Sequence, residues 1–201
     1  MPLAVNGVVD AQYNLGLMYE NLEKYDLALN WYLKAHSQGF GDASYQIGEL
    51  YFNELLPIDD KDKVAKGFYE KAATSGNYDA QYSLGWIYQY GLGTKQDLKK
   101  AAEYYEKAAS SEDPHILNLI GLAYADYENP LFDKNKTRMY YETASDLGDF
   151  NAPGNLARSF NYFVNYPEFN KAFGLTQDAI QTDILEARKW YRKSLDIGNF
   201  Y

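Results

Sequence analysis

The sequence contains no cysteine and only two histidines, His36 and His115, among its 201 residues. Without cysteine the chain forms neither disulfides nor thiolate metal sites. Two isolated histidines do not make a zinc site, and the acidic run at 59–62 lacks the glycine and final glutamate of a calcium loop. We therefore expect no metal site and no cofactor.

Positive charge is also scarce. The chain has 19 lysines and arginines against 28 acidic residues, a net charge of −9. A nucleic-acid partner needs a basic face, so we expect none. No apolar run is long enough to span a bilayer, so no membrane insertion is expected. The first residues do not resemble a signal peptide, which predicts a cytoplasmic protein if the chain is complete and a periplasmic or secreted one if a signal was removed.

Motifs of catalysis are missing as well. No Gly-x-Ser-x-Gly turn is present to position a nucleophile, and we expect no catalytic residues. The short loop Gly91-Leu92-Gly93 resembles part of a phosphate-binding loop. Such a loop follows a strand, however, and this one follows a helical pattern. It is predicted to be a tight turn between helices.

Aromatic residues are abundant, at 17% of the chain, and they recur with a fixed spacing. A glycine anchor has alanine five residues before it and tyrosine three after it. Anchors occur at Gly16, Gly48, Gly85 and Gly121, and more weakly at Ala157. Behind each anchor lies an aromatic pair: Trp31-Tyr32, Phe68-Tyr69, Tyr104-Tyr105, Tyr140-Tyr141 and Trp190-Tyr191. Five copies at intervals of 32 to 37 residues indicate an internal repeat.

Each copy is predicted to form two helices. The third has an apolar stripe at Ala80, Leu84 and Tyr88, followed by a second helix from about Leu98. The anchor glycine disfavours a helix, so we expect it to allow close approach of the partner helix. Helix starts are predicted at four aspartates, and left-handed glycines are predicted where second helices end. These residues are Asp10, Asp42, Asp79 and Asp113, and Gly39, Gly76, Gly148 and Gly198.

The motif A-x-x-x-L-G-x-x-Y, then G-x-G, then K-A-x-x-Y-Y-x-K-A-A, resembles the Sel-one-like repeat (SLR) family, a relative of the tetratricopeptide repeat. The resemblance covers about residues 10–198 and weakens in the last two copies. It implies an all-α, right-handed α-solenoid of about five helix-turn-helix repeats in a single domain, 1–201. The expected repeats are 10–41, 42–78, 79–113, 114–149 and 150–198, the last with an insertion near 161–186.

In helix-pair arrays the first helices line the concave face. Residues one and four after the anchor, and those two before the core leucine, are predicted to point into this groove. The candidate partner-binding residues are Tyr13, Leu17, Tyr45, Phe52, Tyr82, Trp86, Asn118, Leu122, Arg158 and Asn161. An alternative is that the tyrosines pack only within the array. A further candidate site is the insertion, which carries Phe163, Tyr166, Phe169 and Phe173.

The family resemblance implies an interaction scaffold of bacterial type. We expect a non-enzymatic protein whose partner is another protein or a peptide. One alternative is an immunity or adaptor protein that masks an effector, and another is a hydrolase of the repeat family. Neither end resembles a polar capping repeat, so we expect a piece of a longer array. The sequence does not indicate an oligomeric state.

Overall fold

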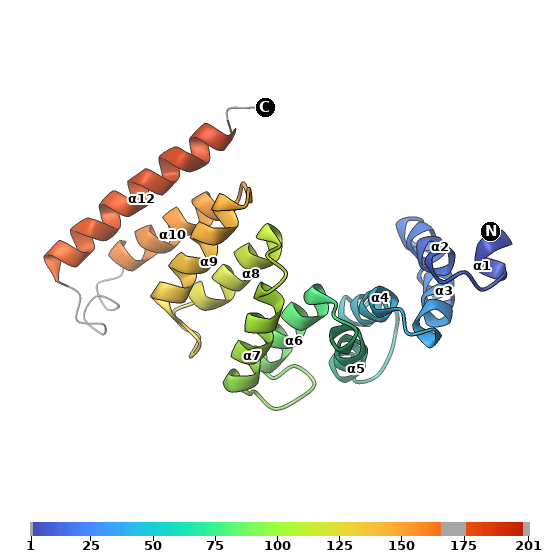
Figure 1. Ribbon diagram of the computed structural model, residues 1–201. Coiled ribbons are helices and arrows are strands. Elements are labelled where there is room, and N and C mark those ends of the chain that lie inside the picture. Colours follow the sequence, from blue (N-terminus) through green and yellow to red (C-terminus); the bar gives the residue numbers. More distant parts are fainter. Residues whose placement is uncertain (1, 166–175, 199–201) are drawn as a thin grey trace. The chain divides into compact units, whose positions relative to one another are not determined.

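The computed structural model describes residues 2–165 and 176–198, and these contain eleven α-helices and no strand (Figure 1). The expected all-α class is therefore confirmed. The short helix α1 (Pro2–Val5) precedes five helix pairs. The pairs are α2 (Val9–Asn21) with α3 (Tyr25–Ser37), α4 (Gly41–Phe52) with α5 (Lys61–Thr74), α6 (Tyr78–Tyr90) with α7 (Leu98–Ala109), α8 (Pro114–Ala125) with α9 (Lys134–Asp146), and α10 (Ala152–Asn165) with α12 (Gln177–Gly198).

The chain divides into two compact units, Met1–Ser110 and Ser111–Tyr201. The first unit holds three helix pairs and the second holds two. In each unit the first helix of a repeat packs against the second, and the second helix packs against the next repeat. The single-domain assignment stays a prediction.

The anchor glycines are required by contact with a tyrosine of the second helix. A Cβ atom on Gly16, Gly48, Gly85 or Gly121 would lie 2.4, 2.6, 2.5 or 2.8 Å from the nearest ring atom of Tyr32, Tyr69, Tyr105 or Tyr141, respectively. Each of these tyrosines is at most 1% exposed. The expected close approach is confirmed, and its partner is an aromatic ring inserted between the two helices.

Helix termini follow the predictions in part. Asp113 caps α8 by accepting the backbone N–H groups of His115 and Ile116, with Pro114 as the first helical residue. The expectation for the other three aspartates was wrong by two positions. The N-cap residues of α2, α4 and α6 are Val8, Phe40 and Asn77, and Asp10, Asp42 and Asp79 lie in the first turn. A carboxylate in the first turn still stabilises the helix, because it lies at the positive end of the helix dipole.

Three of the four glycines predicted to end second helices adopt the left-handed conformation, and the fourth, Gly198, is the last residue of α12. Gly39, Gly76 and Gly148 have φ angles of 85°, 89° and 100°. Gly91 and Gly93 also have positive φ, and a Cβ on Gly93 would lie 2.5 Å from the backbone nitrogen of Lys63. The Gly-x-Gly segment is therefore the tight turn that the sequence predicts, packed closely on the start of α5.

The insertion lengthens the helices of the fifth repeat. Its first residues, 161–165, end α10, and residues 177–186 belong to α12. Ion pairs tie α12 to α9, from Lys134 Nζ to Asp183 Oδ2 (2.5 Å) and from Lys193 Nζ to Asp146 Oδ1 (3.2 Å). The aromatic residues predicted as a second site, including the side chain of Phe163, lie outside what the structure describes.

Candidate functional site

Three candidate tyrosines in the first unit pack on the buried tyrosine of their own repeat. The ring centroids are 5.8 Å apart for Tyr13 and Tyr32, 5.7 Å for Tyr45 and Tyr69, and 5.6 Å for Tyr82 and Tyr105. Tyr13, Tyr45 and Tyr82 are half-buried. Burial raises the pKa of all three, that of Tyr82 to about 12. These side chains thus support the fold and keep part of each ring accessible.

The buried tyrosines place their hydroxyl groups against polar side chains of the first helix. The Tyr69 hydroxyl donates to Glu49 Oε1 at 2.6 Å. In the first and third repeats the acceptors are Glu20 for Tyr32 and Gln89 for Tyr105. Burial is the main cause that raises the pKa of Tyr32 and Tyr69, and the neighbouring glutamate adds to it.

The acceptor occupies one of two repeat positions. Glu49 lies one residue after its anchor, whereas Glu20 and Gln89 lie four residues after theirs. The position that does not supply the acceptor carries a large apolar residue, and these are Leu17, Phe52 and Trp86. In each of the first three repeats, the residue at one position accepts the hydrogen bond of the buried tyrosine, and the residue at the other position is apolar.

We call the surface at these two positions the first-helix face. In the first unit it belongs to α2, α4 and α6, and in the second to α8 and α10. All ten candidate residues lie on these five helices, as the sequence predicts.

Trp86 and Phe52 are the large aromatic groups at these positions. The half-buried indole of Trp86 lies 4.4 Å from the ring of Tyr90, centroid to centroid, and Tyr90 is 41% exposed. Phe52 packs on Tyr69, and Lys61 Nζ lies 5.9 Å from the Phe52 ring centroid. Trp86 and Tyr90 together form an accessible aromatic pair.

In the second unit a chain of hydrogen bonds links candidate residues of α8 and α10. Asn118 is 6% exposed and accepts a hydrogen bond from Asn155 Nδ2 at 2.8 Å. Asn155 Oδ1 in turn accepts from Arg158 Nη2 at 2.6 Å. Asn118 thus faces inward and orients Asn155, which orients the exposed Arg158. Asn161 is exposed on the same helix.

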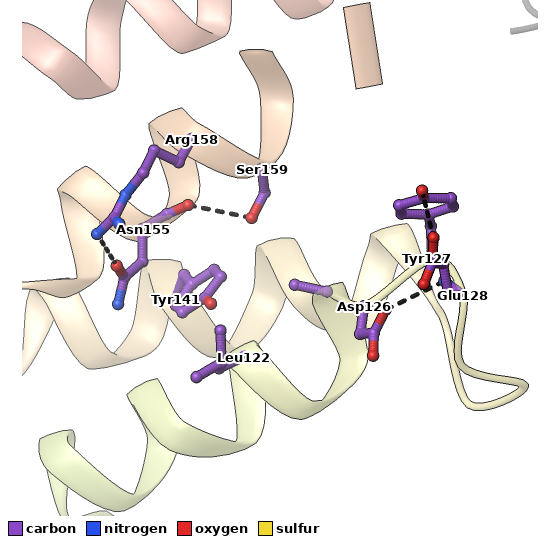
Figure 2. Close-up of a pocket in the computed structure, with 9 residues that line it drawn as sticks. Leu122, Asp126, Tyr127, Glu128, Tyr141, Asn155, Arg158 and Ser159 are labelled. Carbon is purple, nitrogen blue, oxygen red and sulfur yellow. Dashed lines mark hydrogen bonds between the residues drawn. The ribbon is translucent and has the colours of Figure 1, made fainter. Parts of the chain in front are cut away.

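A cavity of about 420 Å³ lies beside Arg158 in the second unit (Figure 2). Asn155, Arg158 and Ser159 of α10 border it, as does the ring of Tyr141 from α9. Its other lining residues are Leu122 and Ala125 of α8, and Asp126, Tyr127 and Glu128 of the loop that follows. The fourth repeat has Leu122 and Ala125 where the first three repeats place a polar acceptor. The cavity consequently has an apolar wall between groups of opposite charge.

One pair of side chains resembles the start of a catalytic arrangement. His36 Nδ1 lies 2.7 Å from Ser44 Oγ. A nucleophilic serine must reach its substrate, but Ser44 is 3% exposed and also donates to the carbonyl of Phe40. The His36 ring packs against Phe68, with centroids 5.4 Å apart. This contact joins α3 to α4.

Over residues 2–165 and 176–198, no group of three or more histidine, cysteine or acidic side chains is arranged to hold a metal ion. Across that same part of the chain, no helix combines the length and apolar character needed to cross a bilayer.

Several residues around the candidate site are not marked by the repeat pattern. Asn155 was not predicted, although it links Asn118 to Arg158. Asp126 and Glu128 follow the helix of the fourth repeat, and nothing in the repeat pattern marks them. Glu20 and Gln89 fall at predicted groove positions, but their bonds to buried tyrosines require the structure.

Comparison with known proteins matches the Sel1 repeat model to residues 9–40, 41–77, 79–113, 129–149 and 172–199. These five segments cover more than half of the chain, and five is the number of repeats that the sequence predicts. No curated protein matches this chain significantly.

Solved structures share the fold. A Sel1 repeat protein from Oxalobacter formigenes is 26% identical, with a TM-score of 0.69 over 96% of this chain and 75% of that one. A protective antigen with an SLR fold from uropathogenic Escherichia coli is 24% identical, with a TM-score of 0.66 over 98% of this chain and 47% of its own length. A putative Sel1 repeat protein from Klebsiella pneumoniae is 22% identical, with a TM-score of 0.62 over 97% of this chain and 89% of that one.

All three proteins are bacterial, in line with the bacterial type expected for this chain. The repeat motif, the helix pairs and these matches agree, and the chain belongs to the Sel1 repeat family, whose α-solenoid fold it shares.

Proposed function

We propose that this chain is a non-enzymatic scaffold that binds another protein or a peptide on the first-helix face. Sel1 repeat proteins are typically interaction scaffolds, which supports this function.

One observation carries the proposal. The position directly after the anchor holds Trp86, Leu122 and Arg158 in the third, fourth and fifth repeats. Leu122 is 52% exposed, Arg158 is exposed, and Trp86 is half-buried beside the accessible Tyr90 ring. Aromatic side chains and arginine are enriched among the residues that dominate binding at protein interfaces. Each unit thus supplies its own interface anchors at an equivalent position.

Two of these residues are expected to contribute most. Trp86 offers a large apolar area and an indole N–H that can donate one hydrogen bond. Arg158 is a cation in a chain of net charge −9, so it attracts an acidic group of a partner. Truncation of such an anchor to alanine costs about 2 kcal/mol, which is roughly thirtyfold in affinity.

The test is capture of partners from the source cell with the full chain, followed by identification by mass spectrometry and affinity measurement. We expect Trp86→Ala and Arg158→Ala to weaken binding of the identified partner while the helical circular dichroism signal is unchanged. Matched controls lie on second helices: Trp31→Ala on α3 and Arg188→Ala on α12 should bind like wild type.

The opposite pattern would contradict the proposal. If both first-helix variants bind normally and changes within 161–186 abolish binding, the insertion is the binding site. A lower melting temperature with unchanged affinity would assign Trp86 to packing alone.

A further inference from the structure

The cavity beside Arg158 has one wall that carries a positive charge in a defined position. Arg158 donates to Asn155 Oδ1, and Asn155 is held by the buried Asn118. The guanidinium group is therefore oriented by two amides before any ligand arrives. Pre-orientation lowers the entropy lost when a partner binds.

Arg158 has no acidic partner within the described part of the chain. The arginine ion pairs found there are those of Arg138, to Glu142 and Glu186, and the one hydrogen bond found for Arg158 is to a neutral amide. A guanidinium group can bind a carboxylate through two parallel hydrogen bonds. A carboxylate from a ligand would make these bonds without breaking an ion pair of the protein.

The opposite wall carries two carboxylates on the loop that follows α8. Asp126 Oδ1 accepts the backbone N–H of Glu128 at 3.1 Å, and Glu128 Oε1 accepts the hydroxyl of Tyr127 at 2.8 Å. No ion pair is found for Asp126 or Glu128 in the described residues. Between the charged walls lie Leu122 and the ring of Tyr141 (Figure 2). The cavity thus presents positive, apolar and negative surfaces in turn.

We propose that this cavity binds a peptide segment in which an apolar side chain is flanked by an acidic and a basic one. The acidic group meets Arg158, the apolar group meets Leu122, and the basic group meets Asp126 and Glu128. A uniformly acidic segment would be repelled by the net charge of −9, and a uniformly basic one would place a cation against Arg158. The volume of about 420 Å³ falls within the range typical of ligand sites. This inference rests on the proposed function and names the kind of segment recognised in the second unit.

The experiment selects peptides from a random phage-displayed library against the immobilised full chain, and then measures the affinity of synthetic copies by fluorescence anisotropy. We expect the selected peptides to be enriched in an acidic, an apolar and a basic residue close together. Arg158→Glu should weaken their binding by about tenfold or more, because like charges then face each other. Replacing the acidic residue of the peptide by lysine should restore binding to the Arg158→Glu protein.

The matched control is Arg188→Glu, which makes the same charge change on the exposed surface of α12, away from the cavity. It should bind like wild type. Glu128→Lys tests the opposite wall: it should weaken the same peptides, and exchange of their basic residue for glutamate should restore binding.

Each other outcome overturns the inference. Peptides that depend on Trp86 but bind the Arg158→Glu and Arg188→Glu proteins equally would refute the cavity site and leave the proposed function standing. Loss of binding that no charge exchange in the peptide restores would show that Arg158 acts through the fold. If no peptide is enriched over the uncoated support, peptide binding fails along with the inference.

Discussion

Replacing Gly85 by alanine tests the contact on which the repeat is built. The new Cβ would lie 2.5 Å from two ring atoms of Tyr105, closer than packed side chains allow. The ring has no free space to move into, because Tyr105 is fully buried and its hydroxyl donates to Gln89. Overpacking of this kind costs about 1–3 kcal/mol. Because the ring cannot move, we place this cost near the upper end of the range. The better helix propensity of alanine returns up to about 1 kcal/mol, so we expect a net loss of about 2 kcal/mol.

A matched control, Gly67→Ala, should change the stability in the opposite direction. Gly67 lies in the middle of α5, where a Cβ would meet no atom within 4 Å. Gly67→Ala should therefore stabilise the protein by up to about 1 kcal/mol through helix propensity alone. Thermal unfolding followed by circular dichroism separates the two, since 1 kcal/mol shifts the midpoint by roughly 2–4 °C in a chain of this size.

A double-mutant cycle identifies the cause. Tyr105→Leu removes the ring edge that the new methyl group would contact, so the cost of Gly85→Ala should shrink in its presence. If Gly85→Ala is as stable as wild type, or if its cost is the same with and without the Tyr105 ring, the close contact does not explain the glycine.

Three further outcomes are expected. Gly93→Ala should destabilise the protein by about 1–2 kcal/mol, because the position has a φ of 59° and its Cβ would collide with the backbone of Lys63; an unchanged unfolding midpoint would contradict this. Lys134→Met should cost about 2 kcal/mol by leaving the buried carboxylate of Asp183 unpaired. The double change with Asp183→Leu should recover part of the loss, and no recovery would refute the ion-pair explanation. Stability should be fully present below about pH 10 and should fall as pH rises toward about 12, because burial raises the pKa of Tyr82 to about 12 while an unfolded tyrosine ionises near 10. Absorbance titration of tyrosinate checks this, and ionisation of every tyrosine near pH 10 in the folded protein would be inconsistent with it.

The repeat and its core could be predicted because they depend on local spacing. Alanine, glycine and tyrosine recur on one face of a helix, and that periodicity alone indicates the helix pairs and the glycine contact. The spacing does not show which residue of each aromatic pair is buried. In four repeats the second aromatic residue is buried, but in the fifth Trp190 is 5% exposed and Tyr191 is 38% exposed. Ala157 stands at the anchor there, so the fifth repeat lacks the glycine that makes room for the tyrosine ring in the other four.

The candidate site was predicted only to the level of the helix face. Trp86 and Arg158 could be selected because they stand directly after an anchor. The same position also holds Glu49, which faces the buried Tyr69, so the spacing does not tell which residues there are exposed. The amide link through Asn155 depends on the packing of α8 against α10, and the cavity depends on where the loop after α8 turns. Neither is encoded in the spacing of one repeat.

The exchange of roles between two positions gives this repeat an unusual freedom to change its surface. The hydroxyl group of the buried tyrosine donates to Glu49 at one position in the second repeat, and to Glu20 or Gln89 at the other position in the first and third repeats. This hydrogen bond therefore does not determine which of the two positions carries the polar residue. Moving the polar residue moves the apolar one by three residues, about 4.5 Å along the helix axis. An engineered or evolving array could therefore move its surface contact groups independently in each repeat, while the buried core remains the same.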